Sequence, residues 1–436
     1  MNLFAAFTRT YKRLIRWFTV PTTATEMDPR NFLNVQIDAV GVGLASAANP
    51  FLPVFLTRLG ATPLQIGMLT TMPAITGLLL SIPLGQFLQG RKNIVPWFSL
   101  ARLMVLSGYA LTGIITFFLP ETASVLGILG IWALATIPQT ILNITFSVVM
   151  SNIAGPAGRY ELMAHRWSIL GFTNSITALL VGQFLDRLPF PVNYQIMFIA
   201  LSVGGLISYW FSSQLKLPQN TKVDAFQGGR LKERASEYLH LILNEKPFIS
   251  FVLKRFVFLT GTSLVLPLFP LYFVRVLEAS DSWIAAINTA QNGIVIIGYF
   301  YWTGQLRRIG SLKVLIITTF GTALYPILTG VTGAVWVLPF YAAMAGIFNA
   351  GLNLVLFDEL MKRVPVEYSA TFVAAAQSFQ YLSSIAAPLF GTWLATQVGF
   401  GPALIFGGAF SIIGTVLFAL ELLRGKKAIE VEKEAV

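Results

Sequence analysis

Side-chain amides recur inside stretches of this chain that are otherwise apolar. They fall mainly in residues 33–56, 123–150, 283–304 and 335–361, and a few more lie in 369–396. An unpaired polar group in hydrocarbon is costly, so each of these side chains needs a partner or a ligand. The amides that we take as candidates for contact with a polar ligand are Asn34, Gln139, Asn143, Gln291, Asn292, Asn349, Asn353 and Gln377.

Two pairs of these amides share a helical spacing. Gln139 and Asn143 are four residues apart, and so are Asn349 and Asn353. Residues at this spacing lie on one helix face, one turn apart, where both could bind one polar or amphipathic solute. The alternative is that the amides bridge neighbouring helices, at about 0.6–2 kcal/mol each. For a single amide we favour bridging. For the set we favour the lining of a cavity, because several apolar stretches contain no amide.

Charged residues inside the apolar stretches suggest gating or coupling. Asp38 is the only acid well inside the first half, and Arg255 stands 217 residues later at the matching place of the second half. One hypothesis is an Asp38–Arg255 ion pair that opens and closes between the two halves. The alternatives are a static pair of Asp38 with Arg102, or a proton-binding role for Asp38, with a pKa raised by desolvation.

A second acidic pair ends the stretch 335–361. Asp358 and Glu359 precede Lys362 and Arg363, so each acid has a base four residues on. A coupling role is open, and ion pairs at a helix end are the favoured interpretation.

The elements that position these residues are long apolar segments. A hydrocarbon core of about 30 Å needs a helix of about 20 residues, and in lipid the backbone of each segment must satisfy its own hydrogen bonds. Mean hydropathy is +0.70, and only 11% of residues are charged. We therefore predict an all-α integral membrane protein with twelve transmembrane helices, at 33–56, 64–88, 94–119, 123–150, 165–186, 192–213, 248–274, 283–304, 312–332, 335–361, 369–396 and 402–423.

The basic residues predict the orientation. If the amino terminus is cytoplasmic, only Arg58, Arg187 and Arg275 of the 30 Lys and Arg residues fall at outer ends. This asymmetry favours cytoplasmic amino and carboxyl termini and a plasma (inner) membrane protein. The net charge of +11 then faces lipid, and we expect no nucleic-acid partner. The chain has no cysteine and two histidines, so we expect no metal site and no cofactor.

An internal repeat divides the chain. The pattern Pro-x-x-Pro, with Arg five residues later, occurs at 50–58 and again at 267–275. A parallel repeat of two six-helix halves follows from this spacing. The predicted domains are an amphipathic cytoplasmic segment at 1–30, a six-helix bundle at 31–214, a cytoplasmic linker at 215–247, a second six-helix bundle at 248–424 and a charged cytoplasmic tail at 425–436.

Two loops carry a glycine–basic pattern at corresponding places of the halves. Their residues are Gly85, Gly90, Arg91 and Lys92 in the first half, and Gly304, Arg307, Arg308 and Gly310 in the second. With twelve segments, the parallel repeat and the polar central loop, the chain resembles the major facilitator superfamily. Both loops depart from that family's motif, because neither has its acidic residue; Gln89 stands there in the first.

The resemblance implies two pseudo-symmetric bundles that move a solute by alternating access. We expect a secondary active transporter of a small organic solute, with proton coupling left open. The alternatives are a drug or metabolite efflux antiporter, and a non-transporting receptor or assembly factor with the same fold. We do not expect an enzyme. The expected partners are a small-molecule substrate, protons if transport is coupled, and membrane lipid, with the chain as a monomer.

Overall fold

The computed structural model describes residues 28–89, 91, 93–217, 242, 244–363 and 369–434. Nearly all of the predicted amphipathic segment 1–30 and most of the predicted linker 215–247 lie outside these residues. The described part of the predicted tail, up to Glu434, continues the last helix.

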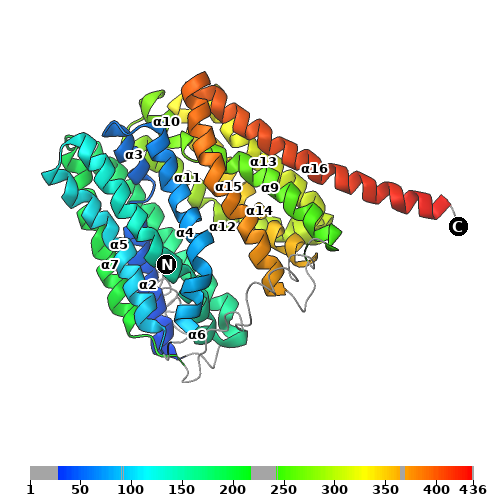
Figure 1. The fold of residues 1–436 in the computed structure, drawn as a ribbon, viewed down its shortest axis with the longest axis horizontal. Helices are drawn as coiled ribbons and strands as arrows, with labels where there is room; N and C mark the ends of the chain where they lie inside the picture. Colours follow the sequence, from blue (N-terminus) through cyan, green and yellow to red (C-terminus); the bar gives the residue numbers. More distant parts are fainter. Residues whose placement is uncertain are drawn as a thin grey trace, which may run out of the picture. The chain divides into compact units, whose positions relative to one another are not determined.

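The described helices follow the predicted segments closely (Figure 1). In the first half they are α2 (Pro29–Ser46), α3 (Phe51–Arg58), α4 (Pro63–Gln89), α5 (Val95–Phe118), α6 (Glu121–Leu185) and α7 (Val192–Ser213). In the second half they are α9 (Lys246–Val265), α10 (Leu268–Arg275), α11 (Asp281–Gly293), α12 (Val295–Ile309), α13 (Ser311–Val331), the short 3-10 helix η1 (Val335–Val337), α14 (Leu338–Met361), α15 (Ser369–Val398) and α16 (Phe400–Glu434).

Ten helical segments of the described chain are long and apolar enough to cross a membrane. The predicted spans 283–304 and 369–396 are helical but are not among the ten. The first is divided where α11 ends at Gly293 and α12 begins at Val295, and each of the two spans carries amides. The fold class is confirmed as a helical membrane protein, while the count of twelve spans and the orientation stay predictions.

Helix α6 is one continuous run of helical residues that covers two predicted spans. The guanidinium of Arg166 nevertheless lies 4.7 Å from the centre of the Phe146 ring. Twenty residues of straight helix would separate these residues by about 30 Å. The chain therefore reverses direction between them, as the predicted spans 123–150 and 165–186 require.

The first compact unit comprises Met1–Leu52 and Leu79–Gln227. In its described part, α2 packs against α6 and α7, and α5 packs against the same two helices. Phe32 and Val35 of α2, Phe98 of α5, and Val149 and Ile153 of α6 are buried in one apolar cluster. This core fixes the positions of α2, α5 and α6 around the buried charges described below.

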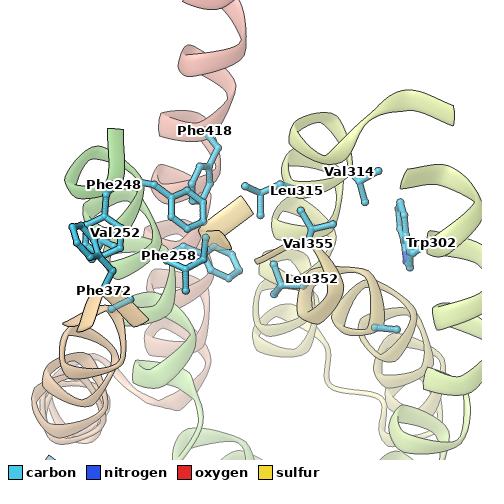
Figure 2. Packing of buried hydrophobic residues seen from close by; sticks show 14 of the residues in the cluster. Phe248, Val252, Phe258, Trp302, Val314, Leu315, Leu352, Val355, Phe372 and Phe418 are labelled. Atoms are coloured by element: carbon cyan, nitrogen blue, oxygen red, sulfur yellow. The ribbon is translucent and has the colours of Figure 1, made fainter. Parts of the chain in front are cut away.

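The second compact unit comprises Pro53–Leu78 and Gly228–Val436. Helix α16 packs against α9 and α13, and α14 packs against α11, α12 and α13. Figure 2 shows the core, where Phe248 and Phe258 of α9 gather with Phe418 of α16, near Leu315 of α13 and Val355 of α14. These aromatic and branched side chains are fully buried and hold the helix ends that carry the charged groups of this unit.

The segment 53–78 belongs to the second unit, although the repeat assigns it to the first six-helix bundle. It begins shortly after the break between α2 and α3, at residues 47–50, and it contains most of α3 and most of α4. Thr71 donates a hydrogen bond to the Ile385 carbonyl of α15, at 3.3 Å. The predicted division into bundles at 31–214 and 248–424 stays a prediction.

Candidate functional site

Asp38 is the centre of a buried charged cluster in the first unit. Nη1 of Arg102 lies 2.5 Å from both carboxylate oxygens of Asp38, and the Ser208 hydroxyl donates to Oδ1 at 2.6 Å. Nη2 of Arg166 lies 3.6 Å from Oδ2. All four residues are at most 3% exposed. Helices α2, α5, α6 and α7 therefore converge on one carboxylate.

Close contact between α2 and α7 brings Ser208 within reach of Asp38. A β-carbon added to Gly41 would lie 2.5 Å from the carbonyl oxygen of Gly204, so both positions require glycine. Small residues let two helix backbones approach closely in a membrane. The short serine side chain can then bond directly to the carboxylate.

Aromatic rings cover the two arginines of the cluster. The guanidinium of Arg102 lies 4.5 Å from the centre of the Phe98 ring, and that of Arg166 lies 4.7 Å from Phe146 and 5.3 Å from Trp167. One carboxylate and two guanidinium groups leave a net charge of +1, and the quadrupole of each ring attracts a cation. Both Nε atoms lack a hydrogen-bond partner within the described residues.

Arg255 lies in the second unit and has a different partner. Its Nη2 donates to Oε1 of Gln380 on α15, at 2.8 Å. Asp38 pairs with Arg102, which is the alternative that the sequence left open. The Asp38–Arg255 gate stays a prediction, since the two residues belong to separate units.

The predicted amides divide into two groups. Gln139 donates to Asn143 at 2.9 Å, so this pair shares one face of α6. The side chains of the remaining six make no hydrogen bond within the described part of the chain; they are Asn34, Gln291 and Asn349, which are half-buried, and Asn292, Asn353 and Gln377, which are exposed. Their donors and acceptors are thus available to water or a solute, and a cavity lined by them stays a prediction.

The acids at the end of α14 form ion pairs. Asp358 lies 2.6 Å from Lys362, and Glu359 lies 2.5 Å from Arg363. Glu359 also accepts a hydrogen bond from Ser311 of α13. Both spacings match the ion pairs favoured from the sequence. Although burial opposes it, the neighbouring carboxylates raise the pKa of Lys362 and of Arg363 above their usual values.

Glu421 of α16 connects this cluster to α9. It lies 2.8 Å from Arg363 and 2.6 Å from Lys254. One acid therefore bridges a base on α9 and a base just after α14.

The arginines that end α3 and α10 make reciprocal contacts within the second unit. Nη2 of Arg58 lies 3.0 Å from Asp281 and donates to the Ala279 carbonyl at 3.4 Å. Nη2 of Arg275 donates to the Ala61 carbonyl at 2.5 Å. Each arginine thus binds the loop that follows the other, and we call this set the arginine clasp.

The loop-signature residues lie in two loops, one in each unit. In the first loop Gly85 is buried and Arg91 lies 4.3 Å from the Phe87 ring centre, whereas Gly90 and Lys92 lie outside the described residues. In the second loop Gly304, Arg307 and Arg308 are exposed. Gly310 has a φ of 83°, which favours glycine at the junction of α12 and α13.

Sequence reasoning missed three residues that the structure connects to these charges. Arg166 lies at the start of the predicted span 165–186, Ser208 is a small hydroxyl far from the amides at the start of its segment, and Glu421 lies near the end of the last span. The Gly204-to-Ser208 spacing, a small-x-x-x-small pattern, was a usable signal for close helix contact. Among the described residues, no group of three or more acidic or histidine side chains is placed to hold a metal ion.

Comparison with known proteins gives one family and one fold. The family model described as Major Facilitator Superfamily matches residues 251–435. A solved structure of a bacterial homologue of the iron transporter ferroportin, in an inward-facing state, is 13% identical with a TM-score of 0.68, and the match covers 89% of this chain and 98% of that one.

Two further structures are similar over the same extent. The nucleoside transporter NupG is 13% identical, with a TM-score of 0.66, covering 89% of this chain and 98% of that one. The xylose transporter XylE from E. coli, in a partially occluded inward-open conformation, is 12% identical, with a TM-score of 0.61, covering 91% of this chain and 97% of that one. At these identities the likeness shows the fold alone.

The family match and the structural similarity overlap in the second half of the chain, and they agree. The match covers most of the second half, and the fold extends over about nine-tenths of the chain. The second half of the chain is therefore similar to the major facilitator superfamily, and most of the chain is similar in fold to solved transporters.

Proposed function

We propose that the protein is a secondary active transporter of a small organic solute that works by alternating access. The observation that carries the proposal is a pair of helix breaks at matching positions. The α-helix is interrupted at 47–50, between α2 and α3, and at 266–267, between α9 and α10, although Leu266 and Pro267 keep helical backbone angles. The second break follows the first by the repeat distance of 217 residues. Interrupted helices at corresponding places of two repeats are typical of secondary transporters and point to their binding sites.

The contacts beyond each break support the same proposal. The arginine clasp and the Thr71 hydrogen bond hold segment 53–78 to the rest of the second unit. These are polar contacts that can break and reform. In a rocking mechanism, this segment is held in one state and released in the other.

The Asp38 cluster serves in this proposal as a rigid anchor of the first unit. Its carboxylate already receives two strong donors, and all of its members are buried. A positioning role for Asp38 and Arg102 is therefore the simplest, and Asp358 and Glu359 are assigned the same role in the second unit.

Reconstitution tests the proposal. The purified chain is placed in liposomes and offered a mixture of sugars, nucleosides, amino acids, organic acids and amphipathic drugs, and the liposome contents are measured by mass spectrometry. We expect at least one solute to accumulate faster than in protein-free liposomes, with saturable kinetics and counterflow.

A matched pair of variants sharpens the test. Pro267→Ala alters the break between α9 and α10 and is expected to slow transport, whereas Arg187→Gln changes an exposed residue of the first unit and leaves transport unchanged. A solute panel that binds without crossing would favour the receptor alternative, and export of drugs alone would favour the efflux antiporter.

A further inference from the structure

Among the described residues of the second unit, Arg255 is a half-buried cation without a carboxylate partner. It lies nine residues inside α9, and its Nε is buried and has no hydrogen-bond partner. Its one hydrogen bond within the described chain goes to Oε1 of Gln380, a neutral acceptor. A guanidinium has five N–H donors, so most of its donor capacity at this site is unused.

The neighbouring charges of the same unit are neutralised. Lys254, the preceding residue, pairs with Glu421, and the bases after α14 pair with their own acids. These pairs leave none of their carboxylates for Arg255. An isolated charge in a low-dielectric site is costly, so a site that keeps one has a reason to do so.

The matching position of the repeat shows what is missing. Residue 38 precedes residue 255 by 217, and there the first unit has a carboxylate that forms an ion pair with Arg102. The second unit has a cation, Arg255, at this position, and none of its described residues supplies a carboxylate that pairs with it. The position is therefore complete in one unit and lacks a negative charge in the other.

The groups around Arg255 are suited to an oxyanion. Gln380 uses its oxygen on Arg255, so its amide N–H₂ is left as a donor, and one turn earlier Gln377 is exposed. Arg255 and Gln380 are both partly exposed, so a ligand can reach them. Guanidinium and amide donors without a competing carboxylate favour carboxylate and phosphate groups, which arginine binds through two parallel hydrogen bonds.

We propose that Arg255 and Gln380 form an anion-binding subsite, and that the transported solute carries a carboxylate or phosphate group. This inference rests on the proposed function and adds the substrate class. Arg255 supplies the charge, and Gln380 holds the guanidinium plane and adds a donor.

Thermal shifts of the purified full chain in neutral detergent test the binding step. The probes are simple carboxylates, dicarboxylates and phosphate esters, each compared with its neutral amide or alcohol at one ionic strength. We expect at least one anion to raise the melting temperature more than its neutral analogue. Arg255→Gln should lower the affinity for that anion about tenfold or more, as the loss of a charged hydrogen bond predicts. Arg255→Lys should retain part of the affinity. Arg187→Gln makes the same charge change at an exposed residue and should bind normally.

A first further experiment distinguishes a lipid headgroup from a soluble anion as the ligand. A second distinguishes failure of the anion-binding inference from failure of the transporter proposal. Micelles containing phosphatidylglycerol replace the soluble probes in the first experiment; a shift with this lipid and with no soluble anion would overturn the claim of a solute site. Liposome uptake by the same variants is the second experiment. Transport of only neutral or cationic solutes, unaffected by Arg255→Gln, would sink this inference and leave the transporter proposal intact. Binding of a soluble anion that depends on Arg255, without uptake of any solute, would support the anion-binding subsite and overturn the transporter proposal.

Discussion

At the scale of single residues, the chain neutralises most of its buried charges through geometry that spacing alone cannot give. Asp38 is bonded by residues 64 and 170 positions away, and Glu421 bridges a base on α9 and a base just after α14. These contacts depend on which helix faces meet. Local pairs at four-residue spacing, such as Asp358 with Lys362, are the exception because one helix sets their distance.

Asp38→Asn should destabilise the first unit strongly. The change removes the one carboxylate between Arg102 and Arg166, and breaking a buried pair by removing one partner costs about 3–5 kcal/mol. The melting temperature of the purified chain should fall accordingly. The double variant Asp38→Asn with Arg102→Gln restores the original net charge of the cluster and should recover part of the loss. Equal melting temperatures for Asp38→Asn and the parent chain would contradict the central role of this carboxylate.

Glu421→Gln should cost more stability than Asp358→Asn. Glu421 has two partners whose side chains are at most 18% exposed, so its loss should cost about 1–3 kcal/mol. The Asp358–Lys362 pair is about half exposed on both sides, and such pairs contribute about 0–1 kcal/mol. Thermal melting of the two variants side by side measures the difference. The reverse order would show that Glu421 does not hold α9 and α14 to α16.

At the scale of elements, most helix bounds followed from hydrophobicity, and the contacts between helices did not. The segment 192–213 was predicted with the bounds that α7 has, because a long apolar run limits both ends of a helix. The breaks within α2–α3 and α9–α10 were signalled by Pro50 and Pro267. Arg166 and Ser208 could not be assigned to the Asp38 cluster, since the sequence does not say which faces of α2, α6 and α7 meet.

Gly41→Ala should separate α2 from α7. The added β-carbon would meet the backbone of Gly204 and Ser208, which cannot move as a side chain can, and such overpacking costs about 1–3 kcal/mol. The Ser208–Asp38 hydrogen bond should lengthen with it. Gly130→Ala is the matched control within the same unit, because no atom lies within 4 Å of its β-carbon; it should be neutral or stabilising by up to about 1 kcal/mol. Thermal melting compares the two, and equal effects would mean that the close approach of α2 and α7 is not required.

At the scale of the whole molecule, the repeat conserves positions of helix breaks while it changes the chemistry at matched sites. Position 38 carries an acid and position 255 a base. Arg58 and Arg275 are matched as well, yet only Arg58 has an ion-pair partner, Asp281, among the described residues. A duplicated architecture can thus keep its mechanical parts alike and specialise its binding groups.

In the proposed alternating-access mechanism, the arginine clasp controls the release of segment 53–78 from the rest of the second unit. Ala61 is 1% exposed, and its carbonyl accepts the bond from Arg275. The chain has no cysteine, so Ala61→Cys introduces a single site for a maleimide probe. Adding Arg58→Gln and Arg275→Gln removes the clasp; a loss of 1–2 kcal/mol would raise the labelling rate about 5–30-fold. Leu64→Cys, at a residue 48% exposed, should label at one rate in both backgrounds. An unchanged rate at position 61 would mean that apolar packing alone holds the segment, and the clasp would then have no part in gating.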